Sequence, residues 1–125
     1  MVRSLENEKA AVTVGTRERG GVVILDVSGK LMGGPESDPL RETLRRIVEG
    51  GTRKMVVNLR GVPWMNSSGL GVLLAGFIQL RKHGGELKFA GLQDRVRAIL
   101  TTTKLITMIE TCPDEDAALR SFQAR

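Results

Sequence analysis

The chain has 125 residues, of which 41% are apolar and 26% are charged, and its net charge is +5. This length and composition predict one globular domain with its own core and exclude a disordered chain. The only cysteine is Cys112 and the only histidine is His83, which excludes an intramolecular disulfide framework and a Cys/His zinc cage. No apolar run approaches the roughly 20 residues that span a bilayer, so we expect a cytoplasmic protein without a membrane partner. We also expect no metal and no cofactor.

Two strands are predicted to open the domain, after a flexible N-terminal segment over residues 1–10. Residues 10–18 alternate weakly between apolar and polar side chains, as an edge strand does. Residues 21–28 read GVVILDVS, a β-branched apolar run that is typical of a buried strand. Because Arg19-Gly20-Gly21 separates the two apolar stretches, we predict a hairpin at the start of a domain that occupies residues 11–123.

Helices and strands then alternate along the chain. Asp38 followed by Pro39 is a favourable helix start, and apolar side chains continue at helical spacing until Gly50 and Gly51 end the helix. The same patterns predict a strand over 54–59, a helix over 70–83, a strand over 86–90, a helix over 93–101, a strand over 105–109 and a helix over 114–122.

The predicted order is β-β-α-β-α-β-α-β-α. Strands separated by helices need crossover connections, which make neighbouring strands parallel. We therefore predict a single α/β domain with a mixed, mostly parallel central sheet of about four or five strands flanked by helices.

Residues 62–74, VPWMNSSGLGVLL, join a predicted strand to a predicted helix and place Ser67 and Ser68 at the helix N-terminus. Free backbone N–H groups and the positive end of the helix dipole favour a hydroxyl or a phosphate there. The spacing matches neither a nucleophile elbow, a P-loop nor a dinucleotide fingerprint. His83 lies about 24 Å away along the same helix, at about 1.5 Å per residue, so it is too remote to act as a base. We therefore expect no enzymatic activity.

Spacing alone favours an ordinary capped helix start, because Asn-Ser-Ser is common capping chemistry. The longer stretch VVNLRGVPWMNSSGLGVLLAGFIQLRKHGGELKFAGL resembles the central signature of the STAS domain family, in particular its bacterial anti-sigma factor antagonists. Their pattern is an apolar strand, a short turn, Asp-Ser-Ser/Thr-Gly-Leu-Gly, a helix, Gly-Gly and another strand. The resemblance extends from Ala11 to Phe122.

The resemblance implies a regulatory binding module that acts on transcription. In the family, the first serine of the pair is the phosphoacceptor for a partner that is both an anti-sigma factor and a serine kinase of the histidine-kinase-like ATPase type. The unphosphorylated domain binds this partner and releases the sigma factor, and phosphorylation ends the binding. The matching phosphoacceptor is Ser67, with Ser68 as second choice, in a protein expected to be a monomer or weak dimer. The implied partner-binding residues are Met32, Asn66, Ser67, Ser68, Gly69, Leu70 and Gly71.

These partner-binding residues are assigned different tasks. Gly69 and Gly71 are expected to let the backbone of a partner approach closely, and Leu70 is expected to offer it an apolar contact. Met32, in the turn-rich segment after the second strand, is interpreted as an adaptable contact at the same surface.

Two positions depart from the family pattern. Asn66 stands where the family has Asp, and Gly29-Lys30-Leu31-Met32 stands where it commonly has Gly-Glu-Leu-Asp. Both missing acids belong to loops that are predicted to flank the serines, where carboxylates are suited to assist phosphotransfer or to hold a metal-bound nucleotide. A domain that docks its partner constitutively, without a phosphorylation switch, is therefore the alternative.

The positive charge is concentrated in residues 40–60, which carry six basic groups against two acidic ones. A basic surface is typical of nucleic-acid binding, but the chain has no tyrosine, few aromatic side chains and no helix-turn-helix signature. In the predicted helix over 40–48, Glu42 is spaced to pair with Arg45 and Arg46. We therefore interpret the charge as a bias towards an acidic protein partner, and expect that reversing Arg41, Arg45 or Arg46 slows association.

Overall fold

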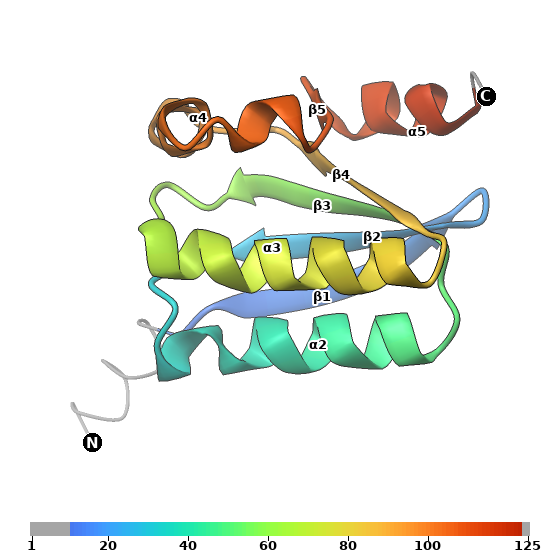
Figure 1. The fold of residues 1–125 in the computed structure, drawn as a ribbon, viewed down its shortest axis with the longest axis horizontal. Coiled ribbons are helices and arrows are strands. Elements are labelled where there is room, and N and C mark those ends of the chain that lie inside the picture. The colour runs from blue at the N-terminus through green and yellow to red at the C-terminus, as the bar shows by residue number, and fades with distance from the viewer. Residues whose placement is uncertain (1–10, 124–125) are drawn as a thin grey trace.

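The computed structural model describes residues 11–123, so the segment 1–10 that was predicted to be flexible lies outside the described residues. One five-stranded sheet forms the centre of the domain, with its strands in sequence order (Figure 1). β1 pairs antiparallel to β2, and each later strand pairs parallel to the one before it. The elements confirm the predicted α/β order: β1 (Thr13–Arg19), β2 (Val22–Ser28), α2 (Asp38–Glu49), β3 (Lys54–Gly61), α3 (Ser67–Lys82), β4 (Glu86–Ala90), α4 (Asp94–Thr102), β5 (Thr111–Cys112) and α5 (Glu115–Gln123).

The alternation of side chains gives the sheet two apolar faces of different size. Leu25 of β2 and Val57 of β3 belong to the larger core, which α2 and α3 cover side by side in Figure 1. Ile24 and Val56 point to the opposite face and belong to the smaller core, which packs under α5. Helices thus cover both faces, as parallel strands require.

The predicted strand over 105–109 is wrong. Lys104 adopts a left-handed conformation with a φ of 63°, and the chain continues into a 3-10 turn, Leu105–Thr107. The half-buried side chains of Leu105 and Ile106 pack against the core together with the buried Ile109, so the apolar run fills one helical turn. The strand that extends the sheet comes later, at Thr111–Cys112, where it pairs with β4.

Lys88 of β4 adds to the positive charge of the sequence but not to that of the surface. Its side chain is fully buried on the α5 side of the sheet. Nζ lies 3.3 Å from a carboxylate oxygen of Glu110 and 4.2 Å from the ring centre of Phe122, and it donates to the hydroxyl of Ser121. Because a buried ammonium group needs such partners, these contacts join α5 to the sheet.

Candidate functional site

The serine turn, residues 62–68, connects β3 to α3 at the carboxyl end of the parallel strands. A parallel bridge between Leu31 and Met65 ties this turn to the loop that follows β2. The Leu31 N–H donates to the Trp64 carbonyl at 3.1 Å, and the Asn66 N–H donates to the Leu31 carbonyl at 3.2 Å. Since Leu31 and Met65 are both buried, the two loops form one unit that is anchored in the core.

Asn66 caps the helix that carries the serines. Its backbone is extended, and its Oδ1 accepts a hydrogen bond from the Gly69 N–H at 2.7 Å. The Asn66 carbonyl accepts from the Leu70 N–H at 2.9 Å, which begins the hydrogen bonding of the helix. The capped helix start expected from the sequence is therefore present. Asparagine provides the cap without a negative charge, and the first turn of α3 contains no acidic residue.

Ser67 and Ser68 occupy the first two positions of α3, and both are exposed. Ser68 lies against Gly33 in the loop after β2, because a Cβ added to Gly33 would be only 2.5 Å from the Ser68 Cβ. Gly33 also has a φ of 83°, a conformation that residues with a side chain rarely adopt. The loop after β2 therefore touches one of the two serines directly, while both serines remain open to a partner.

The two glycines and the leucine that follow the serines have different surroundings. Gly71 is exposed, and a Cβ there would meet no atom within 4 Å, so a partner can approach it closely. A Cβ at the buried Gly69 would overlap the Leu31 carbonyl, so this glycine allows α3 to pack on the loop after β2. This corrects the expectation that Gly69 lets the backbone of a partner approach. Leu70 is only 2% exposed and belongs to the core, which corrects the expectation that it offers a surface contact.

The loop after β2 is held by a carboxylate that the sequence analysis did not single out. Glu36 accepts hydrogen bonds from the backbone N–H groups of Met32, Gly33 and Gly34 at 2.9, 3.0 and 3.0 Å. The Ser37 hydroxyl donates to the same carboxylate. Desolvation alone raises the pKa of Glu36, but the hydrogen bonds outweigh it, so the pKa lies below its ordinary value. Consecutive N–H groups of a glycine-containing loop followed by an acid are the signal that predicts this arrangement.

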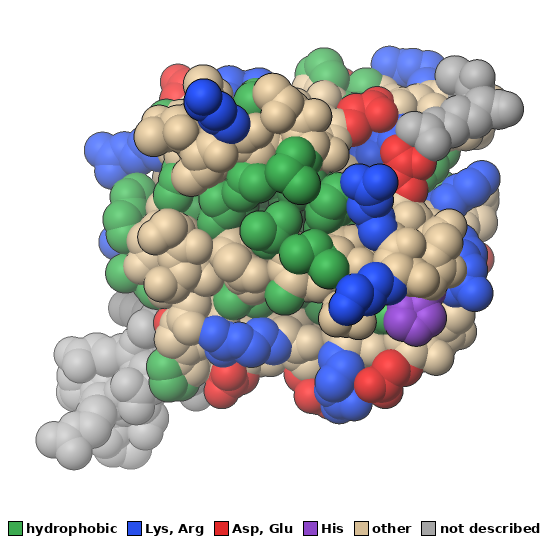
Figure 2. Space-filling view, in the orientation of Figure 1, with side chains coloured by type: hydrophobic (Ala, Val, Ile, Leu, Met, Phe, Trp, Pro, Cys, Tyr) green, Lys and Arg blue, Asp and Glu red, His purple; other side chains and the backbone are tan. Residues whose placement is uncertain are grey.

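The helix α2 uses several of its charges internally. Arg45 pairs with Glu42 at 2.5 Å and with Glu49 at 3.2 Å, which confirms the predicted pair between Glu42 and Arg45. Within residues 11–123, Arg46 forms no ion pair, so the predicted pair between Glu42 and Arg46 is absent. Figure 2 shows acidic and basic side chains next to one another over α2, which limits the net charge of this surface.

Arg41 links α2 to the loop after β2. Its guanidinium group donates to the carbonyls of Gly33 and Gly34 and pairs with Asp38 at 2.8 Å. Two of its contacts thus hold the loop that touches Ser68, and the third lies within α2. Arg41 therefore stabilises the surroundings of the serines as well as contributing charge.

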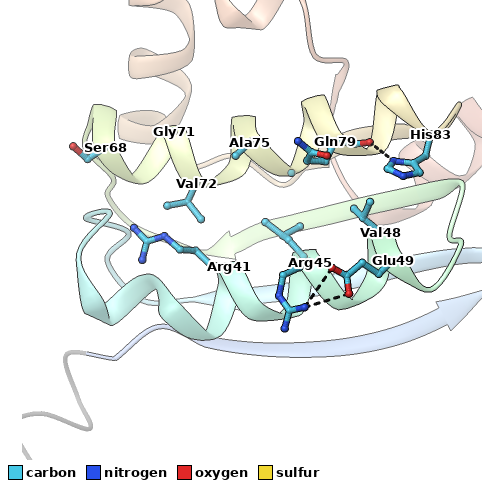
Figure 3. A pocket seen from close by; sticks show the side chains of 12 residues that line it. Arg41, Arg45, Val48, Glu49, Ser68, Gly71, Val72, Ala75, Gln79 and His83 are labelled. Atoms are coloured by element: carbon cyan, nitrogen blue, oxygen red, sulfur yellow. Dashed lines mark hydrogen bonds and ion pairs between the residues drawn. The ribbon is translucent and has the colours of Figure 1, made fainter.

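A groove of about 700 Å³ runs between α2 and α3, and we call it the α2–α3 groove. Ser68 and Gly71 line one end, Ala75 lies in the middle and His83 lies at the other end (Figure 3). The side chains on the α3 side are mostly small, which leaves the space open. The charged residues that line it are Arg41, Arg45 and Glu49.

A second hollow of about 560 Å³ lies at the carboxyl edge of the sheet, and we call it the loop-edge hollow. Its walls come from the loop after β2, the serine turn, the connection from β4 to α4 and the first residues of α4. Ligands of α/β sheets commonly bind at this edge. The lining residues are Lys30, Met32, Pro63, Trp64, Gln93, Asp94 and Arg95.

The described residues place neither a histidine nor a set of metal ligands beside the serines. His83 lies at the opposite end of α3, where Nδ1 is 2.9 Å from the Gln79 carbonyl oxygen. Among residues 11–123, no cluster of His, Cys, Asp and Glu side chains is arranged to hold a metal ion. None of the helices in this part of the chain combines the length and hydropathy that crossing a membrane requires.

The model of the STAS domain family matches residues 13–118. The chain belongs to the STAS domain family. The match begins with β1, includes the serine turn and ends within α5, so it covers almost all of the described structure. The resemblance expected from the sequence is thereby confirmed for the STAS domain as a whole.

The chain is similar to several anti-sigma factor antagonists. An anti-sigma-B factor antagonist of Staphylococcus aureus is 35% identical over 66 residues, which are 53% of this chain and 61% of that protein. The match therefore spans less than two thirds of the length of this curated relative. A crystal structure of an anti-sigma factor antagonist from Mycobacterium paratuberculosis has a TM-score of 0.79 at 24% identity and covers 90% of this chain and 94% of that chain. The phosphorylated form of SpoIIAA from Bacillus has a TM-score of 0.68 at 17% identity and covers 87% of this chain and 99% of that chain.

Proposed function

We propose that this STAS domain is a cytoplasmic anti-sigma factor antagonist, which binds an anti-sigma factor through the serine turn and thereby releases a sigma factor. The observation that carries the proposal is the pair Ser67 and Ser68, exposed at an Asn66-capped helix start within a STAS fold. The relative described as an anti-sigma-B factor antagonist supports this role. The domain acts by binding and carries out no reaction of its own.

Phosphorylation of Ser67 by the same partner, a serine kinase of the histidine-kinase-like ATPase type, ends the binding. A phosphate group adds about −1.5 to −2 charges at pH 7. The N-terminus of α3 stabilises that charge locally, so the fold tolerates it. A partner surface that packs on the turn must instead accommodate a new, strongly hydrated anion, which weakens the complex. The existence of a phosphorylated form of SpoIIAA, which shares the fold, supports this proposal.

Constitutive docking without a switch is the second candidate. It is favoured by Asn66, which stands where the family has Asp, and by the absence of acidic residues from the first turn of α3. The Glu36 carboxylate of the neighbouring loop is already engaged by three backbone N–H groups. The serine turn itself contains no carboxylate that could assist phosphotransfer.

One experiment separates the two candidates. The protein is incubated with ATP and each candidate anti-sigma kinase of its own organism, and phosphorylated residues are mapped by mass spectrometry. We expect one phosphate on Ser67, which is lost in Ser67→Ala and retained in Ser68→Ala. A stable complex without phosphate favours constitutive docking, whereas failure to bind any anti-sigma factor contradicts the antagonist function. Faster phosphorylation of Asn66→Asp is expected if the missing acid limits the rate.

A further inference from the structure

The loop-edge hollow combines side chains that anchor protein interfaces. Trp64 is half-buried and Met32 is 39% exposed, so both present apolar surface beside the serine turn. Trp, Met and Arg are enriched at the centres of interfaces, because each offers a large contact area. The Leu31–Met65 bridge holds the two loops that carry Trp64 and Met32, so this apolar surface has a fixed shape.

The cations of the loop-edge hollow lack partners in the described part of the chain. Lys30 and Arg95 form no ion pair with any of residues 11–123, unlike Arg41 and Arg45 at the α2–α3 groove. Arg95 also occupies the second position of α4, where the positive end of the helix dipole disfavours a cation. Its charge therefore does not stabilise the fold. Two cations face one lining carboxylate, that of Asp94, which leaves a net positive charge in the hollow.

We propose that the loop-edge hollow docks an acidic segment of the protein partner, with an apolar side chain resting on Trp64 and Met32 and carboxylates facing Lys30 and Arg95. This inference rests on the proposed function, since it treats the hollow as part of the partner surface that includes Ser67. Complementary charge speeds the encounter, and the apolar contact slows dissociation. The charge that steers the partner thus lies at the loop edge and not on α2. This replaces the expectation from the sequence that reversal of an α2 arginine slows association.

A peptide experiment tests the hollow without the anti-sigma factor. Trp64 is the only tryptophan of the chain, so its fluorescence reports on this hollow alone. The probe is an acetylated Glu-Glu-Leu-Glu-Glu amide, and a Lys-Lys-Leu-Lys-Lys amide is its control. We expect a saturable change in Trp64 emission with the acidic peptide only. No change, or an equal change with the basic peptide, overturns the inference.

Matched variants of exposed residues show whether the response comes from the hollow. The double reversal Lys30→Glu with Arg95→Glu is expected to abolish it, and Asp94→Asn is expected to strengthen binding about two- to fivefold by removing a repelling carboxylate. The control Arg46→Glu removes an exposed α2 cation that makes no ion pair in the described residues and is expected to change nothing. An equal loss in Arg46→Glu overturns the inference. The same response to ATP alone, with the acidic peptide inactive, also overturns it in favour of a nucleotide site.

Binding kinetics extend the test to an anti-sigma factor that binds the wild-type protein. We expect the double reversal to lower the association rate about tenfold and to flatten its salt dependence. Met32→Ala is expected to raise the dissociation rate, while Arg46→Glu changes neither rate. Unchanged rates in both the double reversal and Met32→Ala overturn the inference. If no anti-sigma factor binds, the proposed function fails while the peptide experiment still decides whether the hollow binds acidic segments.

Discussion

The two hollows beside the serine turn differ in their charge more than in their size. The α2–α3 groove of about 700 Å³ is lined by Arg41 and Arg45, which already pair within α2. Lys30 and Arg95 in the loop-edge hollow of about 560 Å³ have no such partners among residues 11–123. An exposed ion pair has little charge left for a partner, while an unpaired cation keeps its full field. Positive charge in a sequence therefore marks a binding surface only where the fold leaves it unpaired.

The largest effect is expected at the packing between the loop after β2 and α3, where the walls of both hollows meet. Gly69→Ala brings a Cβ into overlap with the Leu31 carbonyl, and we expect a loss of about 3 kcal/mol in the free energy of unfolding. Gly71→Ala is the matched control, since its Cβ meets no atom within 4 Å, and it should stabilise the helix by about 0.4–1 kcal/mol. Urea denaturation measures both changes. Equal stabilities of the two variants would contradict the assigned packing.

The cap of α3 is expected to have the next largest effect. Asn66→Ala removes the acceptor of the Gly69 N–H and should cost about 1 kcal/mol of unfolding free energy. Asn66→Asp keeps the acceptor and adds a charge that the helix dipole favours, so it should be at least as stable as the wild type. Thermal unfolding of both variants at low salt checks this order. An Asn66→Ala protein as stable as the wild type would mean that packing alone positions the serines between the two hollows.

The loop after β2, which contributes Lys30 and Met32 to the loop-edge hollow, should show a smaller, pH-dependent effect. The pKa of Glu36 is lowered in the folded protein, so its stabilising contribution is present above the ordinary value of 4.5 and is lost as the pH falls below it. The difference in unfolding free energy between the wild type and Glu36→Gln should therefore shrink between pH 7 and pH 3. A difference that stays constant over this range would exclude the carboxylate as its cause.

The smallest effect is expected from filling the α2–α3 groove. Ala75 is exposed and lines the groove, so Ala75→Leu should occupy space there without disturbing the core. If the partner docks at the loop-edge hollow, its affinity should stay within about twofold of the wild-type value. Isothermal titration of the anti-sigma factor measures this, with Met32→Ala as the variant expected to weaken binding. A loss of affinity in Ala75→Leu with no loss in Met32→Ala would assign docking to the groove.

The fold and the position of the serines follow from local patterns in the sequence. Apolar runs and helix caps predicted the order of the elements, and the segment around Ser67 predicted an exposed, capped helix start. The prediction of a strand over 105–109 is wrong because an apolar run without clear alternation also fits one helical turn. Lys104 adopts a left-handed conformation and turns the chain at that point. Contacts between such short segments depend on tertiary packing, which local patterns do not contain.

The surface of the site was harder to predict, because it depends on residues far apart in the chain. Leu70 is buried, although it had been expected to contribute to the partner surface. The loop-edge hollow joins Met32, Trp64 and Arg95, which are separated by about 30 residues at each step and meet only because parallel strands end at one edge. The reduced basic surface also weakens the case for nucleic-acid binding.

The most direct test of the central claim is the displacement of a sigma factor from its anti-sigma factor by this protein, before and after phosphorylation. We predict that the unphosphorylated protein displaces the sigma factor. Phosphorylation on Ser67 should raise the concentration required by at least about tenfold, equivalent to about 1.4 kcal/mol. Ser67→Ala should displace it whether or not kinase and ATP are present. Displacement that is unaffected by a phosphate on Ser67 would contradict the switch, and absence of displacement by the unphosphorylated protein would contradict the antagonist function itself.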